Sequence, residues 1–220
     1  MEEEIEMRWI VALPGLNSKH VLNDVTRKYG FLSFPEFVDN FFIQNGESDC
    51  KKFKRILDEY GEKIEFAVLV DYKYDMMEKL MKEYSWINWI FPLHLRKEME
   101  VVYKLDVEWV GFPRRKWTRD YSLVEFVHML KENGFKKWYL GFMNERRRRD
   151  LFYFDGFDTT IPFYVGGKLG CLWLGWERKK MVKGKMRSND IIELNIKKFR
   201  EELEKMSNIE CISLFRFGGD

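Results

Sequence analysis

The sequence predicts an α/β protein, a closed (β/α)8 TIM-type barrel or a reduced, irregular version of one. Apolar, strand-like runs alternate with amphipathic, helix-like runs along almost the whole chain of 220 residues. Successive strand-like runs lie roughly 20 to 25 residues apart, the spacing of repeated βα units. Runs such as AVLV and WINWIF are apolar on both faces, as in parallel strands covered by helices on one side and a filled interior on the other. A doubly wound open sheet is the alternative, but no GxGxxG motif follows the first strand to favour it.

The individual elements follow from the period of the apolar residues. The predicted strands are 8–13, 65–70, 87–92, 107–112, 138–142, 157–162 and 171–176, and the predicted helices are 20–29, 75–84, 96–105, 122–133 and 188–206. The helix at 122–133 illustrates the reasoning, because Ser122 is a typical N-cap, Gly134 a typical stop, and the apolar residues between them recur at helical spacing. A short basic helix is expected before 157–162 and a glycine-rich loop after it. We expect residues 1–220 to form a single barrel domain.

Composition excludes several classes of protein. Hydrophobic residues make up 45% and charged residues 34% of the chain, which is typical of soluble globular proteins. The net charge is only +2, so a nucleic-acid partner can be argued only from local clusters of basic residues. The longest apolar runs are too short to cross a membrane, so no membrane partner is expected. Three scattered cysteines and no signal peptide favour a cytoplasmic location, and neither they nor the three histidines have the spacing of a metal site. No metal or cofactor is expected.

Candidate catalytic residues stand where strands end, because in a barrel all loops at the carboxyl ends of the strands meet at one mouth. Asp71 and Asp158 end two separate strands, and such a pair can supply a nucleophile or an acid and a base. His94 follows another strand. The simpler alternative is that each carboxylate caps the helix that follows it and that the histidine lies on the surface.

Basic residues gather in two clusters near predicted strand ends, with a single lysine further along the chain. Arg114 and Arg115 follow a predicted strand, Arg146 and Arg147 begin a run of four arginines, and Lys168 lies in a glycine-rich stretch. These five residues could rim the mouth and hold phosphates. A third basic tract, 178–187, lies outside the mouth. Runs of charge are more often solvated helix faces, and the glycines need no ligand to explain them.

Three blocks of the sequence resemble the tRNA-guanine transglycosylase family, including its deazaguanine-inserting relatives. The blocks are IFPLHLRKEMEVVYKLDVEWVGFP, KWYLGFM and FDGFDTTIP, the last with the pattern F-D-x-x-x-P, and they fall within 64–170. The resemblance implies a TIM barrel and a transferase that exchanges a base through an aspartate nucleophile. It implies Asp158 as the nucleophile, with Asp71, Gly111, Leu140 and Gly141 binding the base. The chain resembles a divergent, reduced member, since the family's zinc site is missing.

Three functions remain open at this stage. The first interpretation is a base-exchange enzyme acting on guanine nucleotides in nucleic acid, and the second is an inactive barrel of the same type that binds nucleic acid or a nucleobase. The third interpretation is an unrelated barrel enzyme in which Asp71 and Asp158 are an acid/base pair for a small phosphorylated substrate.

Overall fold

The structure is a computed structural model, and it describes residues 8–13, 22–40, 49–131 and 133–216. Its centre is a seven-stranded sheet in the order β1-β7-β6-β5-β4-β3-β2, in which every neighbouring pair is parallel. The strands are β1 (Ile10–Ala12), β2 (Phe37–Val38), β3 (Phe66–Val68), β4 (Asn88–Pro92), β5 (Trp109–Pro113), β6 (Lys136–Phe142) and β7 (Gly156–Thr159). Six of these seven strands overlap the predicted ones, and β2 was not predicted.

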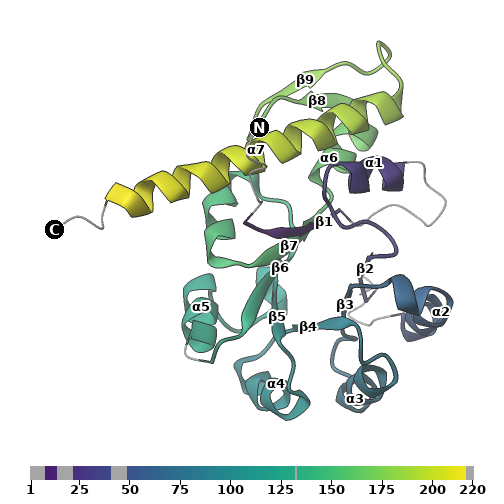
Figure 1. The fold of residues 1–220 in the computed structure, drawn as a ribbon, viewed down its shortest axis with the longest axis vertical. Coiled ribbons are helices and arrows are strands. Elements are labelled where there is room, and N and C mark those ends of the chain that lie inside the picture. Colours follow the sequence, from purple (N-terminus) through teal and green to yellow (C-terminus); the bar gives the residue numbers. More distant parts are fainter. Residues whose placement is uncertain (1–7, 14–21, 41–48, 132, 217–220) are drawn as a thin grey trace.

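The sheet curls into a nearly closed barrel (Figure 1). Its two edge strands approach each other through Leu32, which lies a few residues before β2 and forms a parallel bridge with Ala12 of β1. The backbone N–H of Leu32 donates to Val11 and the N–H of Leu13 donates to Leu32, at 2.9 and 2.8 Å. The prediction of an α/β barrel, reduced from eight strands, is confirmed by this arrangement of the described residues.

Helices surround the barrel, as the amphipathic runs predicted. They are α1 (Leu22–Lys28), α2 (Cys50–Tyr60), α3 (Tyr74–Glu83), α4 (Met99–Leu105), α5 (Leu123–Lys131), α6 (Ile161–Phe163) and α7 (Ser188–Arg216), with short η helices at Gly61–Lys63, Arg96–Glu98, Lys116–Thr118, Glu145–Tyr153 (η4) and Tyr164–Lys168 (η5). The long α7 runs across one side of the ring (Figure 1). The helix predicted at 20–29 corresponds to α1, with its first two residues outside the described part of the chain.

Aromatic side chains fill the inside of the barrel. Phe37, Phe66, Trp109 and Trp138 come from four different strands, and their ring centroids lie 5.2 to 5.7 Å apart in neighbouring pairs. Residues between them in sequence, such as Val110, face the helices instead. This alternation is the two-residue period of a strand, and it buries large apolar surfaces on both faces of each strand.

The predicted strand at 171–176 is wrong as a barrel strand. Cys171–Trp173 forms β8, which pairs antiparallel with β9 (Lys179–Met181) in a separate hairpin. The chain leaves the ring after β7 through α6 and η5, and the hairpin then packs on α7, where the Trp173 and Phe199 rings lie 5.3 Å apart. A strand that is covered by a helix has the same apolar pattern whether its neighbouring strand is parallel or antiparallel, so the sequence does not distinguish the two cases.

The glycine-rich stretch expected to be a loop is helical. A Cβ added to Gly166 would lie 2.8 Å from the Ile192 side chain and 3.1 Å from its Cα, so the glycine allows η5 to pack closely on α7. Among the helices that the structure describes, none combines the length and the hydropathy that a membrane crossing requires.

Candidate functional site

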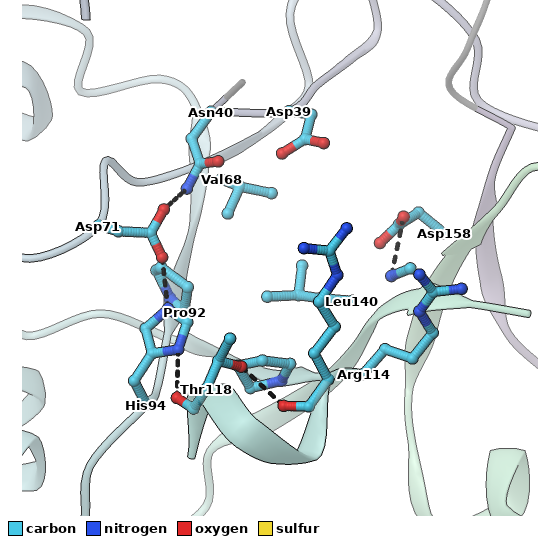
Figure 2. Close-up of a pocket in the computed structure, with 13 residues that line it drawn as sticks. Asp39, Asn40, Val68, Asp71, Pro92, His94, Arg114, Thr118, Leu140 and Asp158 are labelled. Atoms are coloured by element: carbon cyan, nitrogen blue, oxygen red, sulfur yellow. Dashed lines mark hydrogen bonds and ion pairs between the residues drawn. The ribbon is translucent and has the colours of Figure 1, made fainter. Parts of the chain in front are cut away.

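A cavity of about 220 Å³ opens at the carboxyl ends of the barrel strands. Its walls come from the carboxyl-terminal residues of β3 to β7 and from the segments that follow β2 to β5, because parallel strands deliver all their carboxyl ends to the same side of a barrel. The lining residues are Asp39, Asn40, Val68, Asp71, Pro92, His94, Pro113, Arg114, Arg115, Thr118, Leu140, Gly141 and Asp158. Figure 2 shows Asp71 between Asn40 and His94 on one side of this cavity and Asp158 on the other.

Asp158 is buried at the end of β7 and is held by two neutral donors. The indole Nε1–H of Trp138 donates to Oδ1 and the backbone N–H of Gly141 donates to Oδ2, both at 3.0 Å. Burial is the largest influence on this carboxyl and, with the charge of Asp39, raises its pKa to about 7, while the two hydrogen bonds act in the opposite direction. Asp158 can therefore exchange a proton near neutral pH.

Gly141 can make this contact because of its backbone conformation. It has φ +68°, in the left-handed region, at a point where the pairing of β6 with β7 becomes irregular. A Cβ added there would meet nothing within 4 Å, so the glycine is required for its backbone angle and not for space. The bend turns the N–H of Gly141 toward the carboxylate of the neighbouring strand.

Asp71 and His94 form a buried pair on the opposite side. Oδ1 of Asp71 is bonded to Nε2 of His94, and Oδ2 accepts a 2.5 Å hydrogen bond from the side-chain amide of Asn40. Asn40 is itself anchored, since the same amide donates to the Leu69 carbonyl at 2.7 Å. The ring Nδ1 of His94 lies 2.8 Å from the Thr118 carbonyl, which can only accept, so this nitrogen is assigned the hydrogen. A second proton then lies between Nε2 and Asp71.

The pKa of His94 reflects this geometry. Burial by itself lowers the pKa, but the hydrogen bond and the negative charge of Asp71 outweigh it, helped by the Thr118 carbonyl and Glu98, so that the net shift is upward. Glu98 also fixes the backbone, because its carboxylate accepts the N–H groups of His94 and Leu95 at 2.7 and 2.8 Å. The imidazole is thus held in place and favours its charged form.

Asp39 is a third carboxylate at the cavity. It follows the short β2 strand and lines the cavity, where the residue is exposed overall while nearby protein atoms remove part of the hydration of its carboxyl. That loss of hydration, together with the charge of Asp71, raises its pKa to about 6 against the opposing hydrogen bond from the Asn40 backbone. Asp39 also influences Asp158 through its charge, so the protonation of the two carboxyls is linked.

Two arginines stand at the exposed rim. Arg114 and Arg115 follow β5, and both line the cavity. Their loop is held by Arg119, whose guanidinium lies over the Phe112 ring at 4.3 Å and donates to the Pro113 carbonyl at 3.1 Å. Cationic side chains above buried carboxylates suit an anionic ligand that reaches down to the acids.

The structure brings together seven of the residues singled out from the sequence, namely Asp71, His94, Asp158, Leu140, Gly141, Arg114 and Arg115. Gly111 lies below them. A Cβ there would be 2.6 Å from Cδ1 of Leu140, so Gly111 makes room for the side chain that forms the floor of the cavity.

The remaining basic residues lie outside the lining of the cavity. Arg146 is 3.3 Å from Glu177, Arg147 is 2.5 Å from Asp150, and Lys168 lies over the Tyr164 ring at 5.4 Å. The expectation that they rim the mouth with Arg114 and Arg115 is therefore not met, because η4 and η5 direct them elsewhere.

Sequence reasoning missed Asp39 and Asn40 altogether and gave His94 no partner. Asp39 and Asn40 do follow an apolar pair, Phe37 and Val38, as residues at the end of a strand would. A strand of two residues is too short, however, to be recognised by the period of its apolar residues. No group of three or more His, Cys, Asp or Glu side chains within the described ranges is arranged to hold a metal ion.

Fold and site together define the class of protein as an α/β barrel with an acidic cavity at the carboxyl ends of its strands. No protein-family model matches the chain. It is 30% identical over 145 residues to a protein of Acidianus two-tailed virus named Uncharacterized protein ORF192, a match that covers 64% of this chain and 72% of the viral protein. The chain belongs to the family of that viral protein.

Solved structures with a related architecture are more distant. One, described as the native KDPGal structure, has a TM-score of 0.49 at 11% identity, covering 93% of this chain and 100% of the other. Another is the Bacillus subtilis YkuI protein, with an EAL domain, in complex with its substrate c-di-GMP and calcium. It has a TM-score of 0.37 at 12% identity, covering 84% of this chain and 49% of that one. The assignment of a barrel rests on the strand order and not on these likenesses.

Proposed function

We propose that the protein is a barrel enzyme that moves protons on a small phosphorylated substrate. In this proposal Asp158 is the acid/base group, the Asp71–His94 pair is a second site of proton transfer, and Arg114 and Arg115 bind the phosphate. The observation that carries the proposal is the convergence on one cavity of two buried proton-exchanging groups from different strands, beneath two arginines.

The protonation behaviour of Asp158 supports the acid/base role. A general acid or base works best when its pKa lies near the working pH, and such groups accelerate proton transfer by roughly 10²- to 10⁴-fold. The pKa of Asp158, raised to about 7, meets this requirement. Both of its oxygens accept hydrogen bonds from the protein, which orients the carboxyl toward the cavity.

The Asp71–His94 pair on the opposite side of the cavity supports a second proton-transfer group. His94 is held by hydrogen bonds at both ring nitrogens, so its orientation is fixed before a substrate arrives. Because both ring nitrogens are bonded within the protein, a proton from this side reaches a substrate through the Asp71 carboxyl, while the charged imidazole can stabilise negative charge that develops nearby. Two such groups facing each other suit a reaction in which one removes a proton and the other supplies one.

The size and rim of the cavity support a small anionic substrate. About 220 Å³ is below the usual volume of a site for a drug-sized ligand, which begins at roughly 300 Å³. Since Asp39, Asp71 and Asp158 would repel a phosphate placed deep inside, the phosphate belongs at the rim beside Arg114 and Arg115.

Binding of inorganic phosphate tests the rim. Calorimetric titration of the wild-type protein should show binding that is lost in Arg114→Gln/Arg115→Gln. The control Arg55→Gln/Lys63→Gln removes two exposed charges elsewhere and should bind as wild type does. Equal phosphate binding by both double variants would show that Arg114 and Arg115 do not bind the phosphate.

Proton exchange tests the chemistry. In D₂O, a panel of phosphorylated aldoses and ketoses should yield at least one compound that gains deuterium at a carbon beside its carbonyl, and Asp158→Asn should abolish the exchange. Phosphate binding without exchange on any member of the panel would reduce the site to a binding module.

Base exchange is the second candidate, favoured by one observation. Four of the five residues that the transglycosylase resemblance requires, Asp158, Asp71, Leu140 and Gly141, line the same cavity. Incubation with guanine-containing RNA or DNA and a labelled base should then trap an adduct that survives denaturation. An adduct that persists undiminished in Asp158→Asn would eliminate the aspartate as the nucleophile.

A further inference from the structure

We propose that the β8–β9 hairpin and the loop after it, residues 171–187, form a docking surface for the phosphate backbone of a nucleic acid. We call this segment the basic hairpin. It lies against α7, on the opposite side of the ring from α3 and α4 (Figure 1). None of its residues lines the cavity, so this surface is independent of the proposed enzymatic function.

Charge is concentrated here more than anywhere else in the chain. Residues 178–187 contain six basic residues and no acidic one. The whole chain carries +2, so that removing the +6 of this tract leaves −4 for all the rest. A local positive field on an otherwise acidic protein is the electrostatic mark of a site for a polyanion.

Three lysines of the basic hairpin are exposed and can contact phosphate groups. Lys180, Lys183 and Lys185 are exposed, and no acidic side chain in the described part of the chain pairs with them. Lys179 differs, because it turns inward to Glu145 at 2.6 Å, as expected for the residue opposite the buried Trp173. Lys180 is opposite Leu172, on the outer face of the hairpin.

The arginine run of η4 extends the same surface. Arg146 and Arg148 lie 3.3 and 3.2 Å from Glu177, which stands at the turn of the hairpin. Two basic tracts about 30 residues apart in sequence therefore meet at one acidic residue. Arg146 remains almost fully solvent-exposed in this position, with 85% of its side chain accessible.

The chemistry of the hairpin favours nucleic acid over an anionic membrane. Duplex DNA carries one negative charge per roughly 1.7 Å of its axis, and a two-stranded ribbon fits its major groove. Membrane surfaces are bound by combining basic residues with aromatic side chains that enter the lipid. The tryptophans here turn the other way, since Trp173 and Trp176 both pack on Phe199 of α7. The large apolar side chains that the hairpin does expose, Leu174, Met181 and Met186, are not aromatic.

The test uses fluorescence anisotropy with a labelled duplex and a labelled single strand of mixed sequence. We expect wild-type protein to bind at about 50 mM salt and to weaken steeply by about 200 mM. Lys180→Gln/Lys183→Gln/Lys185→Gln should lower the affinity on the order of 10²-fold at about 0.1 M salt and reduce the salt slope by about three.

The matched control is Lys51→Gln/Lys63→Gln/Lys131→Gln, which makes the same change in net charge at exposed lysines far from the hairpin in sequence. It should bind as wild type does. Three results would overturn the proposal: no binding of either nucleic acid by the wild type, equal losses in the two triple variants, or tighter binding to vesicles of anionic phospholipid than to nucleic acid.

Discussion

The two sides of the cavity hold the same kind of residue, a buried aspartate at a strand end, in opposite electrostatic settings. Asp158 receives hydrogen bonds from an indole and a backbone amide, which are neutral dipoles. Asp71 is bonded to an imidazole that carries charge and to the amide of Asn40. Dipoles only partly offset the cost of burying a carboxylate, so the pKa of Asp158 rises, whereas the charge on Asp71 is matched by that of His94, whose pKa rises in turn.

Position in a barrel therefore selects candidate residues but does not assign their roles. Both aspartates stand near the carboxyl end of a barrel strand, Asp158 within β7 and Asp71 three residues after β3 ends. The side chains bonded directly to each one separate a proton-exchanging carboxyl from a paired one. Asp39 links the two sides through its charge, since it lies close enough to influence Asp158 and be influenced by Asp71.

The largest effect is expected from Asp158→Asn. If Asp158 is the acid/base group, turnover of any substrate found should fall by about 10²- to 10⁴-fold, because the amide cannot exchange a proton but keeps the shape of the side chain. The control Asp75→Asn, on the exposed first turn of α3, should leave turnover unchanged. Steady-state kinetics of the two variants measure the effect. Full activity of Asp158→Asn would contradict its role as the acid/base group.

The other side of the cavity is tested by His94→Ala. Removing the imidazole leaves Asp71 buried with its charge unmatched, so we expect the free energy of unfolding to fall by about 3 to 5 kcal/mol. Denaturant titration measures this. In the double variant His94→Ala/Asp71→Ala the losses should be clearly less than additive, and simple additivity would contradict the pairing.

The pH dependence of stability separates the two settings directly. The folded pKa of Asp158 lies above the value of about 3.9 for an unfolded aspartate, so its contribution is fully present below pH 4 and is lost as the pH rises through about 7. The loss amounts to up to about 4 kcal/mol at 1.4 kcal/mol per pKa unit. Denaturant titrations from pH 4 to 8 should show this decline in wild type and a shallower one in Asp158→Asn. Parallel curves would show that burial does not raise the pKa of this group.

The smallest change in stability is expected at Gly111, beneath the Leu140 side chain that forms the floor of the cavity. Gly111→Ala places a methyl group against Leu140 and should cost about 1 to 3 kcal/mol through overpacking. Gly167→Ala is the control, because a Cβ there meets only Cδ1 of Ile192 at an ordinary 3.4 Å. Thermal unfolding of both variants measures the difference, and equal melting temperatures would mean that the floor can adjust.

Much of the fold could be predicted because its signals are local. The strands β3 to β7 and the helices α3, α5 and α7 each have a clear apolar period, and their alternation determines the class. The hairpin was misassigned because β8 is apolar like a barrel strand, and only its contact with α7 distinguishes it. The two-residue β2 gives no period at all.

The candidate site was predictable to a similar degree. Asp71 and Asp158 stand out as polar residues at the ends of apolar strands, and both line the cavity. The run at Arg146 and Arg147 has the composition of a phosphate-binding rim but lies outside the lining of the cavity. The sequence shows that these residues are charged, but not toward which part of the fold their helix directs them.

The strands, the helices around them and the end of the barrel at which the aspartates lie can all be read from the sequence, since they depend on apolar periods within a few residues and on the alternation of strands with helices. Four features depend on long-range contacts: the bridge of Leu32 to β1, the hydrogen bond between His94 and Asp71, the place of Asp39 at the cavity, and the antiparallel pairing of β8 with β9. Each of these joins residues far apart in the chain, and both the free energy of such contacts and the protonation they impose exist only when the folded chain brings the partners together.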